Sequence, residues 1–123
     1  MKLRTKAFAL RVLALIDALP EKRSSRVIAN QLARAGTSVG ANYRAVCRAK
    51  SVADMANKLT IVEEEVDESA FWLELLAEHK LLPPAHVEAL HAEAGEITAI
   101  MVASRKTLLR KDRESKIENR KLQ

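Results

Sequence analysis

The sequence has few of the residues that build sheets, disulfides or irregular loops. Its 123 residues include three glycines, three prolines and one cysteine, Cys47, and aromatic residues make up only 3%. A single cysteine excludes an intrachain disulfide and therefore a disulfide-stapled secreted scaffold. The scarcity of aromatic and turn-forming residues, beside abundant alanine, leucine, glutamate, lysine and arginine, is typical of an all-α protein.

A long apolar run is also missing. No window approaches the roughly 18 uninterrupted apolar residues that a membrane-spanning helix needs. The basic start, residues 1–6, precedes an apolar stretch that Arg11 and Asp17 interrupt, and that stretch lacks the small-residue cleavage site of a signal peptide. We therefore expect a cytoplasmic protein without a membrane partner.

Apolar residues at helical spacing predict four helices, at about residues 5–19, 25–50, 51–80 and 84–109. Three short connections between four helices make neighbours antiparallel. The predicted fold is thus an all-α, up-down-up-down antiparallel four-helix bundle formed by residues 1–110. The polar residues 111–123 are expected to form a basic tail that frays or is disordered.

Local signals predict where three of these helices begin. Ser24 or Ser25 is suited to cap the second helix, and Ser51 followed by Asp54 resembles a capping box at the start of the third. Pro84 is suited to the first position of the fourth helix. The serine and aspartate side chains accept hydrogen bonds from backbone N–H groups that have no partner at the start of a helix, and proline has no N–H group there.

The third helix carries two apolar rows, while the first helix has only about half the length of the others. One row steps by alternating four and three residues, as in a coiled coil, and its members are Met55, Leu59, Val62, Val66, Ser69, Leu73 and Leu76. A short first helix leaves part of the long helices uncovered. We therefore expect a second copy of the chain to cover that part, giving a homo-oligomer.

Charge is distributed unevenly along the chain. Residues 1–50 carry a net charge of +9, residues 51–104 carry −9, and residues 105–123 carry +5. The basic residues of the last block are Arg105, Lys106, Arg110, Lys111, Arg113, Lys116, Arg120 and Lys121. Two interpretations of this block are open: a solvated end that keeps the protein soluble, or a surface that contacts the phosphates of RNA or DNA.

Small residues interrupt the second helix, because Gly36 and Gly40 each cost about 1 kcal/mol relative to alanine in a helix. Together with Ala33 and Ala41 they form a strip that lets another backbone approach closely. Polar groups beside the strip suggest a tight helix crossing with a polar lock, and a ligand or nucleic-acid contact is the alternative. The residues assigned to helix packing or subunit contact are Gly36, Thr37, Ser38, Gly40, Asn42, Arg44, Glu68 and Trp72.

Two segments carry a resemblance to a known family. The segment from Thr37 to Arg44 reads TSVGANYR, and the segment from Phe71 to Leu76 reads FWLELL. With the residues around them, these segments resemble the four-helix bundle proteins encoded in intervening sequences of bacterial 23S rRNA genes, over roughly residues 6 to 110. The resemblance implies ring-like homopentamers without established catalytic activity. Relatives include an accessory protein of diversity-generating retroelements, which implies nucleic acid and a reverse transcriptase as partners.

No residue set in the sequence predicts a reaction. Glu65 and Glu68 lie on the second row of the third helix, whose members are Ile61, Glu65, Glu68, Trp72 and Leu75. An arginine such as Arg34, Arg44 or Arg48 is the expected partner of a buried carboxylate there, and simple exposure of the two carboxylates is the alternative. The segment from Glu88 to His91 matches the Glu-x-x-His motif of di-metal bundles, but it occurs once where two copies are needed. We expect no catalytic residue, no metal site and no cofactor.

Two functional classes therefore stay open. The first is an oligomeric accessory protein that binds nucleic acid through basic surfaces. The second is a purely structural or protein-interaction scaffold with no nucleic-acid role.

Overall fold

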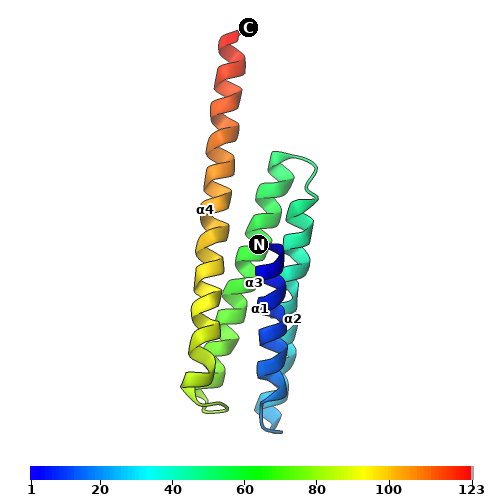
Figure 1. Cartoon of the computed structure of the whole chain (residues 1–123), viewed down its shortest axis with the longest axis vertical. Coiled ribbons are helices and arrows are strands. Elements are labelled where there is room, and N and C mark those ends of the chain that lie inside the picture. Colours follow the sequence, from blue (N-terminus) through cyan, green and yellow to red (C-terminus); the bar gives the residue numbers. More distant parts are fainter. Residues whose placement is uncertain (123) are drawn as a thin grey trace.

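The computed structural model describes residues 1–122 and contains four α-helices in that range: α1 (Lys2–Asp17), α2 (Arg23–Cys47), α3 (Val52–Glu78) and α4 (Pro84–Leu122). Consecutive helices run in opposite directions along one long axis (Figure 1). α1 packs on α2, α2 on α3 and α3 on α4, and a smaller contact joins α1 to α4. The predicted all-α, up-down-up-down bundle is confirmed.

The capping signals of α3 and α4 are confirmed. The Ser51 hydroxyl accepts a hydrogen bond from the backbone N–H of Asp54 at 3.0 Å, and the Asp54 carboxylate accepts one from the backbone N–H of Lys50 at 3.0 Å. Asp54 also binds Lys58, and these hydrogen bonds, chiefly that from Lys58, lower the pKa of its carboxyl group. Pro84 is the first residue of α4, as predicted.

The predicted cap of α2 is wrong. The extended residue Lys22 takes the N-cap position, so the helix begins at Arg23 and includes both Ser24 and Ser25. The turn made by Pro20, whose carbonyl accepts a hydrogen bond from the N–H of Lys22 at 3.0 Å, starts the helix earlier than the serines would. Ser25 consequently faces inward, where it is 3% exposed.

One continuous core fills the bundle. All of the predicted row of α3 is buried except Met55, which is only partly covered. α1 contributes Phe8 and Val12, both fully buried. The other helices supply the apolar partners Ile28, Leu32, Val39, Val46, Val87, Leu90, Ala94, Ile97 and Met101. In residues 1–122 no helix combines the length and apolar character that crossing a bilayer demands.

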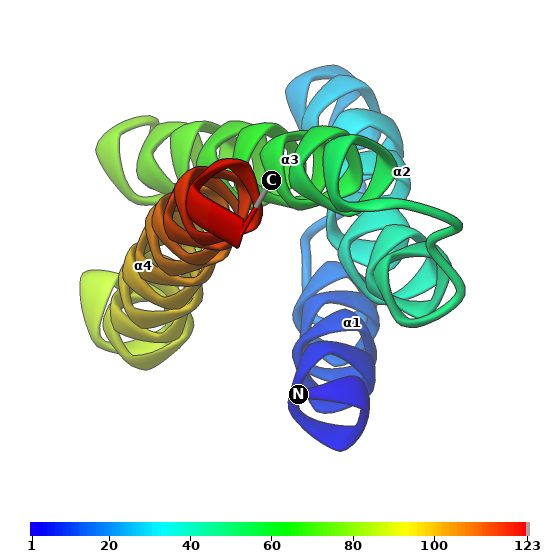
Figure 2. The ribbon, with the colours of Figure 1, turned by 90° about the horizontal axis from the view of Figure 1, so that it is seen from above.

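The helices differ greatly in length. At 1.5 Å per residue, the 16 residues of α1 span about 24 Å and the 39 residues of α4 about 58 Å. The N-terminus therefore lies about half-way along the bundle, and α4 projects past the other helices (Figure 1). Seen along the long axis, the helices follow one another around an arc, with α1 and α4 at its two ends (Figure 2).

An ionic contact ties α1 to α4 across the ends of that arc. The Arg4 guanidinium donates to both carboxylate oxygens of Glu93, at 2.9 and 2.6 Å, and to Glu96 at 3.0 Å. The Glu93 side chain is 16% exposed. The hydrogen bonds from Arg4 lower the pKa of the Glu93 carboxyl group and those to Glu93 raise the pKa of Arg4. This bidentate pair fixes the position of α1 relative to α4.

Candidate nucleic-acid interface

The basic C-terminal segment is helical where the structure describes it. α4 continues without a break to Leu122, whereas the sequence predicted a fraying or disordered tail from residue 111; only Gln123 of that tail lies outside the described residues. Two physical reasons explain the difference. No glycine or proline follows Gly95, and i,i+4 ion pairs form between Arg110 and Glu114 at 3.0 Å and between Lys116 and Asp112 at 3.1 Å.

Arg105 does not belong to the free surface of α4. Its side chain is 28% exposed and donates to Glu63 of α3 at 3.3 Å. Leu108, one turn later, still packs against the core. The other predicted phosphate contacts are exposed, and they are Lys106, Arg110, Lys111, Arg113, Lys116, Arg120 and Lys121.

The projecting part of α4 is nearly balanced in charge. Residues 112–123 contain four lysines and arginines but also Asp112, Glu114 and Glu118, which leaves a net charge of +1. The acidic side chains alternate with the basic ones along the helix, and Asp112 pairs with Lys116 while Glu114 pairs with Arg110, just before this segment. This extension can touch phosphates, but its own carboxylates weaken its attraction for a polyanion.

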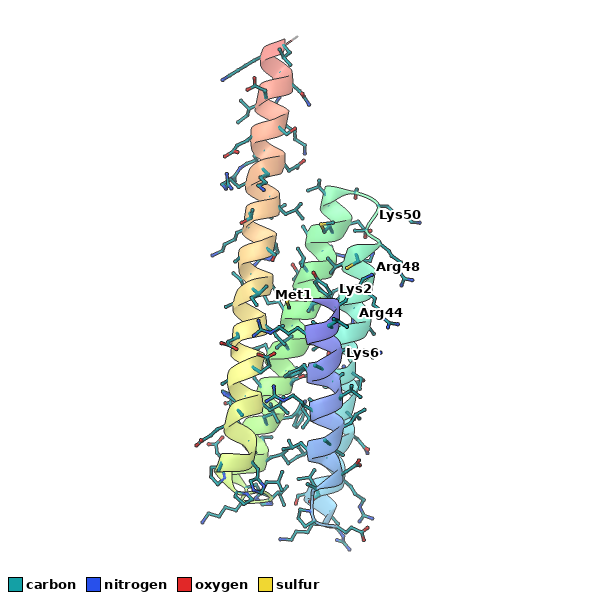
Figure 3. All side chains as sticks on the ribbon, viewed as in Figure 1. Met1, Lys2, Lys6, Arg44, Arg48 and Lys50 are labelled. Atoms are coloured by element: carbon teal, nitrogen blue, oxygen red, sulfur yellow. The ribbon has the colours of Figure 1, made fainter. Side chains whose placement is uncertain are left out.

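A second basic surface lies between α1 and α2, and sequence reasoning missed it. Lys2 and Lys6 of α1 and Arg44 and Arg48 of α2, with Leu3, line a groove of about 320 Å³, which we call the basic groove. Figure 3 shows these side chains on one side of the molecule, with Lys50 farther along the same edge. The +9 charge of residues 1–50 was the available signal, but it did not say which basic residues meet.

Arg44 was predicted to serve helix packing or subunit contact, and within one chain it lines the basic groove. It is exposed and lies one helical turn before Arg48 on the same helix. Among residues 1–122, neither arginine forms an ion pair, and neither do Lys2 and Lys6. The four cations therefore face each other and solvent.

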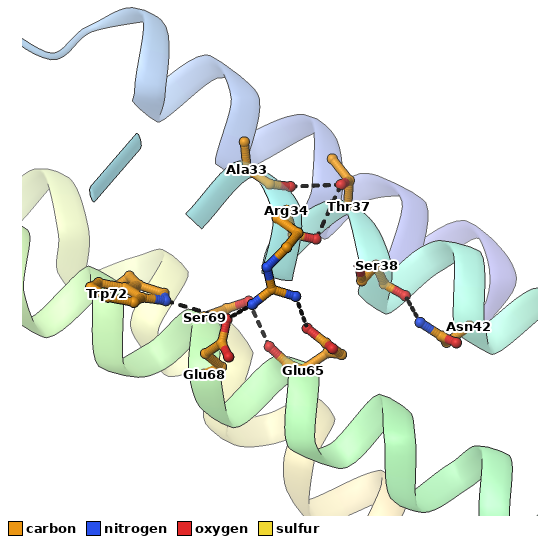
Figure 4. Close-up of polar contacts among 9 residues, drawn as sticks. All are labelled: Ala33, Arg34, Thr37, Ser38, Asn42, Glu65, Glu68, Ser69 and Trp72. Atoms are coloured by element: carbon orange, nitrogen blue, oxygen red, sulfur yellow. Dashed lines mark hydrogen bonds and ion pairs between the residues drawn. The ribbon is translucent and has the colours of Figure 1, made fainter. Parts of the chain in front are cut away.

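The polar cluster predicted on α3 is a structural contact between α2 and α3 (Figure 4). Arg34 donates to Glu65 at 3.2 Å and also to Glu68. The indole N–H of Trp72 donates to the same Glu68 carboxylate at 3.4 Å. The prediction that an arginine pairs with Glu65 and Glu68 is confirmed, and both carboxylates are thereby used as acceptors.

The small-residue strip of α2 faces α1. A Cβ atom at Gly36 would lie 2.8 Å from a Val12 methyl, and one at Gly40 would lie 3.5 Å from the Thr5 carbonyl oxygen. The predicted close helix approach is therefore present within one chain.

The polar residues beside the strip satisfy their own helix rather than a neighbour. Thr37 donates to the Ala33 carbonyl at 2.6 Å, and Asn42 donates to the Ser38 carbonyl at 2.9 Å (Figure 4). A polar lock across the helix crossing is thus not formed by these residues within the described chain.

Histidine and carboxylate side chains do not gather into a metal site in residues 1–122. His91 lies 3.0 Å from Glu74 of α3, so the half-exposed imidazole has a carboxylate partner across the α3–α4 contact.

A third feature is an open apolar groove of about 560 Å³ between α2, α3 and α4, beyond the N-terminal end of α1. We call it the apolar groove, and its lining residues are Tyr43, Val46, Cys47, Met55, Leu59, Ala103, Ser104, Thr107, Leu108 and Lys111. Burial raises the pKa of the Tyr43 phenol. Cys47 is exposed at the edge of this groove.

Comparisons with known proteins agree on one family. The model of the 23S rRNA-intervening sequence protein family matches residues 2–103. A crystal structure of a protein with unknown function from the S23 ribosomal protein family of Bacteroides thetaiotaomicron shares 33% sequence identity and a TM-score of 0.80. The similarity covers 85% of this chain and 97% of that chain. No curated protein matches the sequence.

Proposed function

Because the chain belongs to the 23S rRNA-intervening sequence protein family, we propose that it is a non-enzymatic homo-oligomer that binds nucleic acid through basic surfaces as an accessory factor. One observation carries the nucleic-acid part of the proposal. Seven lysines and arginines after Arg105 are exposed on α4, which projects clear of the other helices (Figure 1).

Exposed apolar residues on α1 support self-association. Leu10 and Leu13 are 58% and 40% exposed on α1. The apolar groove lies where α1 is too short to cover α2, α3 and α4. Apolar surface of this kind on a small protein is typical of a subunit contact. A ring of five copies is the assembly that the family resemblance favours.

Charged residues that could perform catalysis are instead engaged in helix packing. Arg34 binds Glu65 and Glu68, and Arg105 binds Glu63. These pairs connect neighbouring helices, so the three carboxylates Glu63, Glu65 and Glu68 act as acceptors in helix packing. The proposal therefore assigns binding and assembly, not a reaction, to this fold.

The proposed contact with nucleic acid is made to phosphates. Contacts that lysine and arginine make to phosphate oxygens carry no information about the base sequence. The α4 extension carries no aromatic side chain on which bases could stack. Binding should therefore depend weakly on sequence and strongly on salt.

The test measures affinity for duplex DNA and single-stranded RNA against salt concentration, with the full chain and with a chain ending at Lys111. This end point keeps Arg105 and Leu108, which contact the bundle. Each neutralised duplex phosphate contributes about −0.9 to the slope of log affinity against log salt, so the shorter chain should have the flatter slope.

Light scattering supplies the second measurement, with a pentamer mass as the expected result. A full chain without affinity for either nucleic acid at about 50 mM salt would retire the nucleic-acid proposal, because phosphate contacts are strongest at low salt. A structural or protein-interaction scaffold would then be the better account. A monomer mass at micromolar concentration would overturn the assembly.

A further inference from the structure

We propose that the basic groove between α1 and α2 is the principal phosphate-binding site of this protein, and that a nucleic-acid strand is its occupant. The inference rests on the proposed function and names the surface that performs it. It moves the main contact from the end of α4 to the body of the bundle. The groove is formed by Lys2, Lys6, Arg44 and Arg48 around Leu3.

The groove concentrates positive charge without carboxylates of its own. No aspartate or glutamate occurs in residues 1–16 or in residues 22–53, so neither helix supplies an acidic residue beside the four cations. The nearest acidic residue along the chain, Asp54, already binds Lys58 and the N–H of Lys50. The extension of α4, by contrast, keeps only a +1 balance after Lys111. An incoming polyanion therefore gains more at the basic groove.

The position of the lysines is unfavourable for α1 itself. The first turn of a helix carries partial positive charge, which acidic residues normally compensate, yet α1 has no acidic residue in its first turn and no side-chain cap. Lys2 lies in that turn and Lys6 follows it by four residues. The free N–H groups at this helix end add to the attraction for an anion. A bound phosphate would compensate the lysines and the helix end together.

The spacing of the cations suits a strand rather than a single ion. Lys2 and Lys6 are four residues apart on α1, and Arg44 and Arg48 are four residues apart on α2. Side chains at this spacing lie about 5–6 Å apart along a helix, so two short rows of cations face each other across the groove. Arginine can also bind phosphate oxygens through two parallel N–H groups. Successive phosphates of one backbone can therefore be held in sequence.

The experiment compares two matched double variants of α2. Arg44→Gln with Arg48→Gln removes two charges from the basic groove, and Arg23→Gln with Arg26→Gln removes two charges from the opposite end of the same helix. Light scattering must give the wild-type mass for both variants. A changed mass for the groove variant alone would identify the groove as a subunit contact and overturn the proposal.

Affinity for a single-stranded RNA, a duplex DNA of equal length and polyglutamate is then measured in about 0.1 M salt. For the groove variant we expect a loss of tenfold or more for nucleic acid and a duplex salt slope flatter by about 1.8, because two contacts of about 0.9 each are lost. The control variant should lose less than threefold. The chain ending at Lys111 should retain most of its affinity.

Three other outcomes would each contradict the proposal. Equal losses in the two double variants would overturn the basic groove while the proposed function stands. A full chain that binds no nucleic acid would overturn both. If polyglutamate binds the wild-type chain as tightly as RNA does, and the groove variant loses that affinity, the groove would be assigned to an acidic protein partner instead.

Discussion

The two halves of the bundle bury their apolar residues to different degrees. In the half that contains α1, four helices surround the core, and Phe8, Val12 and Leu32 are fully buried. In the half beyond the start of α1, three helices leave the apolar groove open, with Tyr43 half-buried and Cys47 exposed. The first half is complete within one chain. In the second half, the apolar groove is covered only if another molecule binds there.

The largest expected effect comes from comparing Leu32→Ala with Leu59→Ala, one in each half. Leu32 is 0% and Leu59 is 4% exposed, so exposure alone barely separates them. Deleting buried leucine side chains costs about 2–5 kcal/mol, depending on how far neighbours relax into the space. We expect about 4 kcal/mol for Leu32, and about 2–3 kcal/mol for Leu59, since the groove beside it admits relaxation and water.

Chemical denaturation of the two leucine variants measures these free energies of unfolding. Equal costs would show that the half beyond α1 is as tightly packed as the other. They would indicate that a neighbouring subunit fills the apolar groove in solution.

Gly36→Ala tests how closely α1 approaches α2 in the four-helix half. The new methyl would meet Val12 at 2.8 Å, and Val12 is fully buried and cannot move aside easily. We expect a net loss of about 1–2 kcal/mol, although alanine is favoured over glycine in a helix by about 1 kcal/mol. Gly95→Ala is the matched control, because nothing lies within 4 Å of the added carbon. It should raise stability by up to about 1 kcal/mol, and a stabilised Gly36→Ala chain would contradict the close contact.

Glu93→Gln tests the ionic contact that holds α1 against α4. In the folded chain Arg4 lowers the pKa of the Glu93 carboxyl group. The ionised carboxylate therefore stabilises the fold fully at pH values above its unfolded pKa of about 4.3, and this stabilisation is lost as the pH falls through the lower pKa of the folded chain. The Tm difference between wild type and variant should be widest above about pH 5 and should close towards pH 2–3. A difference that is constant over this range would mean that the carboxylate charge does not matter.

Cys47→Ser is expected to have the smallest effect. The thiol is exposed at the edge of the apolar groove, and substitutions at exposed sites usually change stability by less than about 0.5 kcal/mol. In protein diluted until it is monomeric, the thiol should react with a soluble maleimide as fast as in the unfolded chain, because one chain leaves the apolar groove open. Protection of the thiol at concentrations where the oligomer forms would locate a subunit contact at the groove.

The number, order and core faces of the helices could be predicted from the sequence. The alternating row from Leu59 to Leu76 on α3 is buried, and Ser51 with Asp54 caps that helix as expected. These features depend on residues close together in the chain. Local spacing is therefore sufficient to find them.

Features that depend on the meeting of distant segments could not be predicted in the same way. Arg44 lines the same groove as Lys2 and Lys6 because the close contacts at Gly36 and Gly40 fix how α1 lies on α2. No local sequence pattern predicts how far the two helices are shifted along each other. The helical end of α4 was missed for another reason. Its polar composition resembles disorder, while its i,i+4 ion pairs and lack of glycine favour helix.

The position of the N-terminus half-way along the bundle affects how the protein can be labelled or fused. A tag attached to Met1 would leave the chain beside Lys2, which lines the basic groove (Figure 3). A tag carried on the C-terminal end of α4 would be held far from both the basic groove and the apolar groove, because about 20 Å of helix separates Leu109 from Leu122. A fusion at the C-terminal end therefore leaves both grooves open and lies instead beside Arg120 and Lys121, so measurements on the grooves and on assembly are best made with it.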